Sequence, residues 1–247
     1  LLASRWEFTG PDGNTVSVSL PHTWNSKDGQ DGGNDYWRGT CTYRTSFAAP
    51  AYDPAQQQVW LQFEGVNASA AVLLNGQQLC THDGGYSTFR AEITELLQAE
   101  NQLTVKVDNS VNDRVYPQKA DFTFYGGIYR DVSLLVVNKN HIALGHFGDT
   151  GVKITPDLKE GSADIQVETL VEGEGTVVVE LLDAEGNSVA RSEGAKASLH
   201  LDAPHLWNGV KDPYLYTCIV RLLQDGKPVD EVTTKVGLRS FSVDAKK

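Results

Sequence analysis

The chain has 247 residues, 40% of them hydrophobic and 21% charged, which is an ordinary globular composition and long enough for one large or two ordinary domains. The formal net charge of -11 argues against nucleic acid and against an anionic membrane as partners, because both need a basic face. The sequence also has no apolar run near the roughly 20 residues that a membrane-spanning helix requires.

Cysteine and methionine usage adds further expectations. The 3 cysteines lack close spacing, which predicts neither a disulfide framework nor a zinc site. Cys218 shares a strand face with apolar residues and is expected to be a buried thiol. The compartment stays open between the bacterial cytoplasm and the periplasm or exterior. Methionine is absent, so we expect a processed, trimmed or excerpted chain.

The first 40 residues are rich in loop signals around one short strand, 16–20, which ends at Pro21. An acidic, glycine-containing loop follows at 28–35. Its Asp and Asn residues invite a calcium interpretation, but their spacing does not match an EF-hand loop. A solvated loop is therefore the favoured interpretation of this segment.

Residues 41–107 contain short segments in which apolar and polar residues alternate, the pattern of antiparallel strands with one wet face. Asn75-Gly76 lies between two of them and predicts a hairpin with a type I′ turn, since both residues tolerate positive φ. The spacing of Phe89, Ile93, Leu96 and Leu97 indicates one short helical turn, which ends at Asn101. At least six strands joined by glycine-rich turns predict a β-sandwich of jelly-roll type over residues 1–138.

The segment 121–137 closes this first domain. It starts with Asp121 among aromatic residues, passes Gly126-Gly127, and then alternates from Ile128 onward as one more strand. The double glycine allows a sharp turn or a close approach to another group. Arg130 falls on the same predicted inward face as Ile128, and a buried guanidinium needs a partner, so we expect a structural ion pair there.

From residue 139 the aromatic residues thin out and the turns become regular. Alternating segments predict seven or eight strands in just over a hundred residues, at 141–147, 152–155, 163–170, 176–182, 188–191, 197–201, 214–223 and 229–236. This density fits an immunoglobulin-like β-sandwich over residues 139–247. The Cys…Trp…Cys core pattern is missing, which excludes an antibody-type domain. The predicted fold class is thus all-β, a jelly roll followed by an immunoglobulin-like sandwich.

The sequence contains no nucleophile elbow, P-loop, dinucleotide fingerprint or zinc-protease motif. No pair of carboxylates suggests a glycosidase site within the chain. Asp121 is the strongest single candidate, because sugars bind where aromatic faces and carboxylates meet. From the residues alone, the favoured interpretation is an Asp that bonds loop amides or pairs with Arg114. Tyr36 and Trp37 could line a carbohydrate surface or serve inter-domain packing.

Several short motifs together give the chain a resemblance to a known family. In order along nearly the whole sequence they are Leu20-Pro21-His22-Thr23-Trp24, Tyr43-Arg44-Thr45-Ser46-Phe47, Phe63-Glu64-Gly65-Val66-Asn67, Leu74-Asn75-Gly76, His82-Asp83-Gly84-Gly85-Tyr86, Phe89…Ile93-Thr94, Asn101-Gln102-Leu103-Thr104-Val105, Asp121…Gly127-Ile128-Tyr129-Arg130-Asp131-Val132, Leu206-Trp207…Pro213-Tyr214-Leu215-Tyr216 and Val236-Gly237-Leu238-Arg239. Each is weak alone, but their order and spacing resemble the first two domains of glycoside hydrolase family 2, with β-galactosidase-like members matching best.

The resemblance implies a retaining β-glycosidase whose two catalytic glutamates lie in a following (β/α)₈ barrel. That barrel is expected to be absent from this chain, so the chain by itself is expected to be inactive. The resemblance further implies that Asp121 reaches the substrate site and helps hold galactosyl hydroxyls or a sodium ion. Asn34, Asp35 and Trp37 precede the strand of Tyr43 where the family can offer a second substrate-side loop.

The leading hypothesis is therefore the non-catalytic N-terminal portion of a β-galactosidase-like enzyme of carbohydrate breakdown. Its expected partners are its own catalytic barrel, a β-galactoside and further copies of the full-length chain in a homo-oligomer. No cofactor is expected in the chain itself, with sodium or magnesium possible in the full-length enzyme. A stand-alone carbohydrate-binding module and an adhesin-like pair of structural domains are the alternatives.

Overall fold

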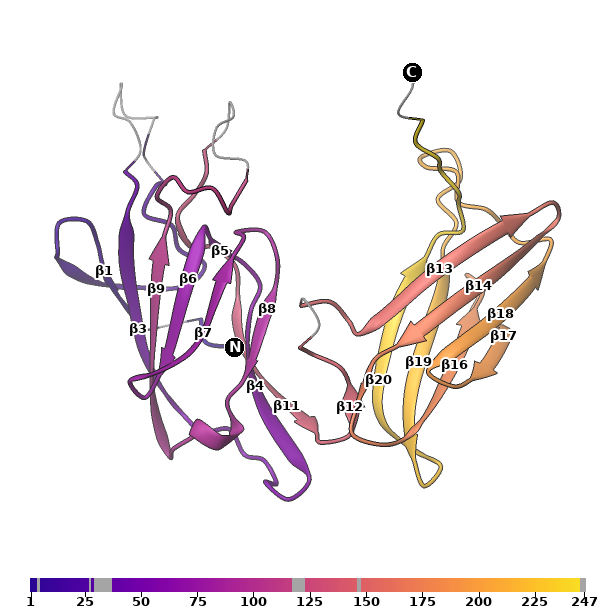
Figure 1. Ribbon diagram of the computed structural model, residues 1–247, viewed down its shortest axis with the longest axis horizontal. Helices are drawn as coiled ribbons and strands as arrows, with labels where there is room; N and C mark the ends of the chain where they lie inside the picture. The colour runs from indigo at the N-terminus through magenta and orange to yellow at the C-terminus, as the bar shows by residue number, and fades with distance from the viewer. Residues whose placement is uncertain (4, 27, 29–36, 117–122, 146–147, 245–247) are drawn as a thin grey trace. The chain divides into compact units, whose positions relative to one another are not determined.

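The computed structural model describes residues 1–3, 5–26, 28, 37–116, 123–145 and 148–244 (Figure 1). The chain forms two compact units, Leu1–Val137 and Asn138–Lys247. Within the described residues the only helical element is the 3₁₀ turn η1, Thr94–Leu96. Everything else regular is β-strand, which confirms the all-β prediction. No helix in these ranges is long and apolar enough to span a bilayer.

The first unit is built on an antiparallel six-stranded sheet. In spatial order its strands are β2 (Thr15–Val18), β1 (Trp6–Thr9), β3 (Thr40–Ala48), β9 (Glu100–Asp108), β6 (Ser69–Leu74) and β7 (Gln77–Asp83). A second sheet contains β11 (Val132–Asn138), β4 (Gln57–Phe63) and β8 (Phe89–Glu92), and a short pair contains β10 (Gly127–Ile128) and β5 (Val66–Asn67). One hydrophobic core holds side chains from both sheets, which makes the unit a β-sandwich.

Strict alternation explains why the central strands lie where they do. In β9, Leu103, Val105 and Val107 are fully buried, whereas the residues between them face outward. β3 buries Cys41 and Tyr43 in the same way. Because side chains alternate between the two faces of a strand, this pattern fixes which face of the six-stranded sheet carries the core.

The β6–β7 hairpin turns at Asn75-Gly76, where φ is 52° and 82°. Two successive positive φ values define the type I′ turn that the sequence predicts, and its twist matches that of the flanking strands. The Asn75 side chain also donates hydrogen bonds to the carbonyl oxygen of Leu96 (2.9 Å) and to Asn101 Oδ1 (3.1 Å). The turn is therefore anchored to the start of β9.

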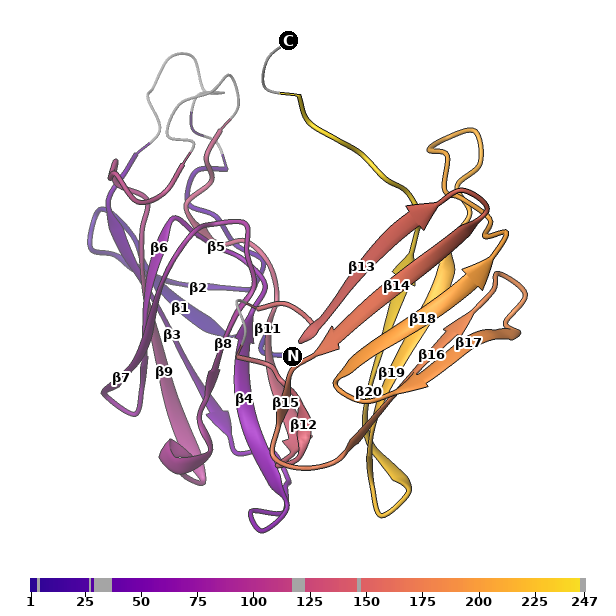
Figure 2. The same ribbon diagram turned by 45° about the vertical axis from the view of Figure 1, so that its right-hand side comes forward.

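The second unit contains a three-stranded and a four-stranded antiparallel sheet (Figure 2). The first has the order β13 (Val152–Lys159), β14 (Ser162–Thr169), β18 (Lys196–Asp202), and the second β17 (Ser188–Glu193), β16 (Thr176–Leu182), β19 (Tyr216–Gln224), β20 (Lys227–Val236). The short strands β12 (His141–Ile142) and β15 (Val171–Glu172) pair separately. Ile165, Leu199, Leu181 and Val220 meet in one core, as in a sandwich.

Two details differ from the sequence-based expectations. The strand expected from Ile128 onward is interrupted, because β10 ends at Ile128 and β11 begins at Val132. Arg130 lies in that interruption and is exposed rather than inward-facing. It donates hydrogen bonds to the carbonyl oxygens of Glu64 (3.3 Å) and Tyr86 (3.2 Å), so the predicted buried ion pair is wrong. The strand expected at 141–147 is also shorter and comprises only His141–Ile142 among the described residues.

Candidate functional site

Four loop segments of the first unit meet around one buried side chain, Asn25. It is fully buried and belongs to the segment 21–28 that follows the cis Leu20-Pro21 bond. Its Nδ2 donates to Asp28 Oδ2 (2.7 Å) and to the carbonyl oxygen of Trp37 (3.0 Å). Its Oδ1 accepts from the backbone N–H of Gly126 (2.8 Å) and from Asn109 Nδ2 (3.2 Å). The Asn25 amide thus makes all four hydrogen bonds that its side chain can form, with partners as far along the sequence as Gly126.

Asn109, which is 3% exposed, extends this network from the end of β9. Its Oδ1 accepts from the N–H of Gly39 (2.9 Å), and its Nδ2 also approaches the carbonyl oxygen of Trp37 (3.4 Å). Asp28 Oδ2 accepts from the N–H of Trp37 (3.0 Å) as well. The backbone of Trp37 is therefore held through both its N–H and its carbonyl, from three side chains.

Gly126 and Gly127 approach this network too closely for any side chain. A Cβ at Gly126 would lie 2.3 Å from a ring carbon of Trp24, and one at Gly127 would lie 2.5 Å from the carbonyl oxygen of His22. Gly127 also has φ of 133°, which disfavours other residues. Thr23 Oγ1 donates to the carbonyl oxygen of Gly126 (2.8 Å). The double glycine therefore lets the backbone at 126–127 pack directly against the segment 22–24, which any side chain at these two positions would prevent.

Aromatic side chains are exposed on the loops of this unit. Trp37 is 36% exposed and lies edge-on to Trp24 at 6.0 Å between ring centroids. Tyr116, Tyr125 and Tyr86 are 71%, 39% and 52% exposed. Exposed aromatic faces on loops are the surfaces on which sugar rings stack. We take the network around Asn25, with Trp37 and the neighbouring loops, as the candidate functional site.

The four residues singled out from the sequence fare differently. Trp37 lies in the site and is held by the Asn25 network. Asn34, Asp35 and Asp121 lie outside the described residues. Arg114, considered as an alternative partner for Asp121, forms an ion pair with Asp83 Oδ2 at 2.8 Å. Neither Asn25 nor Asn109 was singled out from the sequence.

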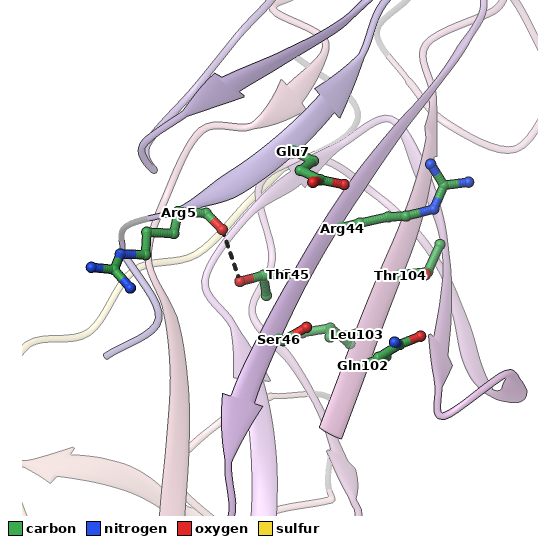
Figure 3. A pocket seen from close by; sticks show the side chains of 8 residues that line it. All are labelled: Arg5, Glu7, Arg44, Thr45, Ser46, Gln102, Leu103 and Thr104. Carbon is green, nitrogen blue, oxygen red and sulfur yellow. Dashed lines mark hydrogen bonds between the residues drawn. The ribbon is translucent and has the colours of Figure 1, made fainter. Parts of the chain in front are cut away.

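A separate polar hollow of about 460 Å³ lies on the outer face of β1, β3 and β9 (Figure 3). Glu7 and Arg44 face each other across neighbouring strands, and Thr104 stands beside Arg44. Arg5 points away from the other side chains in this view. Cross-strand pairs of opposite charge are common on exposed sheets, and this hollow has no aromatic lining, so it is a weaker site for a sugar ring.

Among the residues that the structure describes, no three His, Cys, Asp or Glu side chains gather closely enough to hold a metal ion. His82 hydrogen-bonds the carbonyl oxygen of Gly84 (3.0 Å), stacks on Phe89, and has its pKa lowered by burial. It is a neutral structural histidine at pH 7 in this setting.

Comparison with known proteins places this architecture in a family. The family model described as glycosyl hydrolase 2 galactose-binding domain-like matches residues 29–169, and the model of glycosyl hydrolases family 2 matches residues 146–239. Together they span both units in the order found here.

Individual relatives agree with the family models. A β-glucuronidase of Bacteroides fragilis is 33% identical over 100% of this chain and 38% of its own length. A β-galactosidase of Thermoanaerobacter pseudethanolicus is 28% identical over 97% of this chain and 33% of its own length. The crystal structure of an FMN-binding β-glucuronidase from Facaelibacterium prausnitzii L2-6 superposes with a TM-score of 0.89 at 35% identity, covering 98% of this chain and 39% of that one.

The crystal structure of a Bacteroides fragilis protein that is assigned as a β-galactosidase superposes with a TM-score of 0.88 at 36% identity, covering 99% of this chain and 41% of that one. The chain thus spans less than half the length of the relatives it matches. Because one family model alone covers more than half of the chain, and the other continues to residue 239, the chain belongs to glycosyl hydrolase family 2.

Proposed function

We propose that this chain is the non-catalytic N-terminal portion of a retaining β-glycosidase, where it supports a separate catalytic barrel and contributes to the rim of its substrate site. The observation that supports this most is the match of both sandwiches, in order, to proteins more than twice as long that are named as β-glycosidases. A scaffold role also agrees with the absence of hydrolytic motifs from the sequence.

For the sugar, we propose a β-glucuronide first and a β-galactoside second. The sequence motifs suggested a β-galactosidase-like enzyme. Relatives of similar identity carry both names, since the solved β-glucuronidase and β-galactosidase structures are 35% and 36% identical to this chain. The β-glucuronidase of Bacteroides fragilis is 33% identical, against 28% for the β-galactosidase of Thermoanaerobacter pseudethanolicus. A pyranose ring is common to both sugars, and they differ in the group on C5, a carboxylate or a hydroxymethyl, and in the configuration of the hydroxyl on C4.

For the rim, we propose that Asp121 lends a carboxylate to the bound sugar and that Trp37 lies beside it. Asp121 precedes Gly126 by five residues, and the backbone of Gly126 is bonded to the same Asn25 that holds Trp37. Two segments that the family resemblance marks as substrate-side therefore start from one buried anchor. Carboxylates accept hydrogen bonds from sugar hydroxyls without any change in protonation.

The test uses the full-length protein and the 247-residue chain side by side. With aryl β-glucuronide and aryl β-galactoside, the full-length protein should turn over one of them, and the chain alone should turn over neither. Asp121→Ala in the full-length protein should lower kcat/KM by roughly 100-fold, the scale at which loss of substrate positioning acts, with Tm unchanged within a few degrees. Asp113→Ala, at an exposed aspartate eight positions earlier in the sequence, is the matched control and should be neutral. Hydrolysis by the chain alone would contradict the scaffold role, and normal kinetics of Asp121→Ala would contradict the rim role.

A further inference from the structure

A second concave surface in the first unit has the chemistry of a carbohydrate subsite. It is a groove of about 510 Å³ between the β1–β2 turn and the segment 21–26, within the 300–1,000 Å³ usual for small-ligand sites. The turn contributes polar side chains, and the segment contributes aromatic ones. The residues lining it are Phe8, Gly10, Pro11, Asp12, Asn14, Val16, His22, Thr23, Trp24 and Ser26.

The floor of the groove is aromatic. Phe8 lies nearly parallel to Trp24, with an interplanar angle of 17° and 6.0 Å between centroids. The ring of His22 lies 4.8 Å from that of Phe8. Val16, on edge strand β2, is 53% exposed beside them. Phe8 is only 7% exposed, so the ring surface open to a ligand is that of the half-buried Trp24 and His22. Such surface offers C–H and π contacts to the apolar face of a pyranose.

The rim carries fixed hydrogen-bonding groups. The Asn14 backbone N–H donates to Asp12 Oδ1 (3.0 Å), and Asn14 Nδ2 donates to Asp12 Oδ2 (2.6 Å). These bonds lower the pKa of Asp12, so it is ionised at neutral pH. Each carboxylate oxygen of Asp12 can accept a further hydrogen bond. Because Asp12 and Asn14 are already held by these bonds, binding a ligand costs little additional side-chain entropy.

His22 adds a donor from the floor. The Tyr43 hydroxyl lies 2.8 Å from His22 Nδ1. In the tautomer in which Nδ1 accepts from the phenol, the imidazole hydrogen lies on Nε2. Burial lowers the pKa of His22, so the ring is neutral at pH 7. Among the described residues Nε2 has no hydrogen-bond partner.

We propose that this groove binds a neutral sugar residue of an oligosaccharide, as a non-catalytic subsite within the first unit. The lining contains aromatic rings, an acceptor carboxylate, an amide and a donor imidazole, which are the groups that recognise hydroxyls on a ring with apolar faces. It contains no Lys or Arg, so an acidic sugar finds no counter-charge there and meets the Asp12 carboxylate instead. The subsite is independent of which glycosidic bond the full-length protein cleaves.

The test is calorimetric titration of the 247-residue chain with neutral tetrasaccharides of galactose, glucose, xylose and mannose, and with glucuronate. At least one neutral tetrasaccharide should bind with millimolar or tighter affinity, and glucuronate should not. Ser26→Trp fills the groove from an exposed position, and Asp12→Ala removes the acceptor; each should weaken binding at least about tenfold. Ser17→Trp, on an exposed β2 position outside the groove, is the matched control and should bind as the unmodified chain does.

Circular dichroism spectra and Tm values of each variant show whether it is folded before its binding is compared. If Ser26→Trp fails to fold, Asp12→Ala carries the test, since Asp12 is exposed on a turn. Failure of every neutral tetrasaccharide to bind, binding that both groove variants leave unchanged, or tighter binding of glucuronate would each overturn the proposal. None of these outcomes depends on the hydrolytic activity of the full-length protein, so failure here and failure of the proposed function are separate results.

Discussion

Replacing Asn25 by alanine is the most informative perturbation of the candidate site. The change removes all four hydrogen bonds of the buried amide. Trp37 keeps partial support, because Asn109 Nδ2 still lies 3.4 Å from its carbonyl oxygen and Asp28 still accepts from its N–H. The buried N–H of Gly126 is left without its acceptor.

The expected cost follows from these bonds. One orphaned buried N–H costs about 1–3 kcal/mol, and the three other lost bonds cost about 1 kcal/mol each net, so we expect a total of roughly 4–6 kcal/mol. For a unit of 137 residues, Leu1–Val137, that corresponds to a Tm lower by about 14–21 °C. Thermal unfolding followed by circular dichroism measures it.

Asn101→Ala is the matched control for this prediction. Asn101 is also fully buried in the first unit and also makes four side-chain hydrogen bonds, with Asn75, with the N–H and carbonyl of Gln98, and with the carbonyl of Phe47. It lies at the opposite end of β9 from Asn109, about 26 Å along the strand. Both variants should lose similar stability.

Only Asn25→Ala should change function. In the full-length protein it should lower kcat/KM by about tenfold or more at temperatures where the protein stays folded, with the larger part in KM, because it loosens the backbone that carries Trp37. Equal kinetic losses in Asn25→Ala and Asn101→Ala would mean that Asn25 acts through stability alone and would refute the positioning argument.

Asn25→Asp distinguishes the acceptor bonds of the Asn25 side chain, to Gly126 and Asn109, from its donor bonds, to Asp28 and Trp37. The aspartate keeps the acceptor for Gly126 but presents a carboxylate to Asp28 Oδ2, where the amide now donates at 2.7 Å. Burial and the neighbouring carboxylate raise the folded-state pKa of the new group above its unfolded value. Its protonated form is therefore favoured by folding, and stability is lost as the pH rises through the folded pKa. Relative to the unmodified chain, this variant should be closer to normal at pH 4–5 than at pH 8.

Three further predictions concern other parts of the chain. Burial raises the pKa of Cys41 to about 12 and of Cys218 to about 11, so both thiols should resist alkylation at pH 8 until denaturant is added. Asp164 Oδ1 lies 2.6 Å from His200 Nδ1 and raises the pKa of His200. Asp164→Asn should therefore lower the pKa of His200 towards 6.5 in an NMR titration. The stability that this pair contributes is present below the unfolded-state pKa of His200 and is lost as the pH rises through its folded-state pKa. Gly76→Ala should destabilise the first unit by about 1 kcal/mol in urea unfolding, because φ there is 82°.

The fold could be predicted from the sequence because its signals are local. Alternation over five to nine residues gave the strands of both sandwiches, and Asn75-Gly76 gave a turn type that two dihedral angles now confirm. The same reasoning was wrong at Arg130, since period two was carried through a break between β10 and β11. A periodic pattern contains no information on where the ladder of hydrogen bonds stops.

The candidate site could not be predicted in the same way, because its main contacts are made across long stretches of chain. Asn25 meets Asn109 and Gly126 at separations of 84 and 101 residues, and a lone asparagine after a tryptophan looks like any turn residue. Burial of an amide is favourable only when every donor and acceptor is met, and those partners come from four segments. The one local sign was Gly126-Gly127, which indicates that something must approach closely without naming it. Since the same asparagine bonds both the Trp37 segment and the Gly126 segment, any motion of one loop must either break a buried hydrogen bond or move the other loop with it.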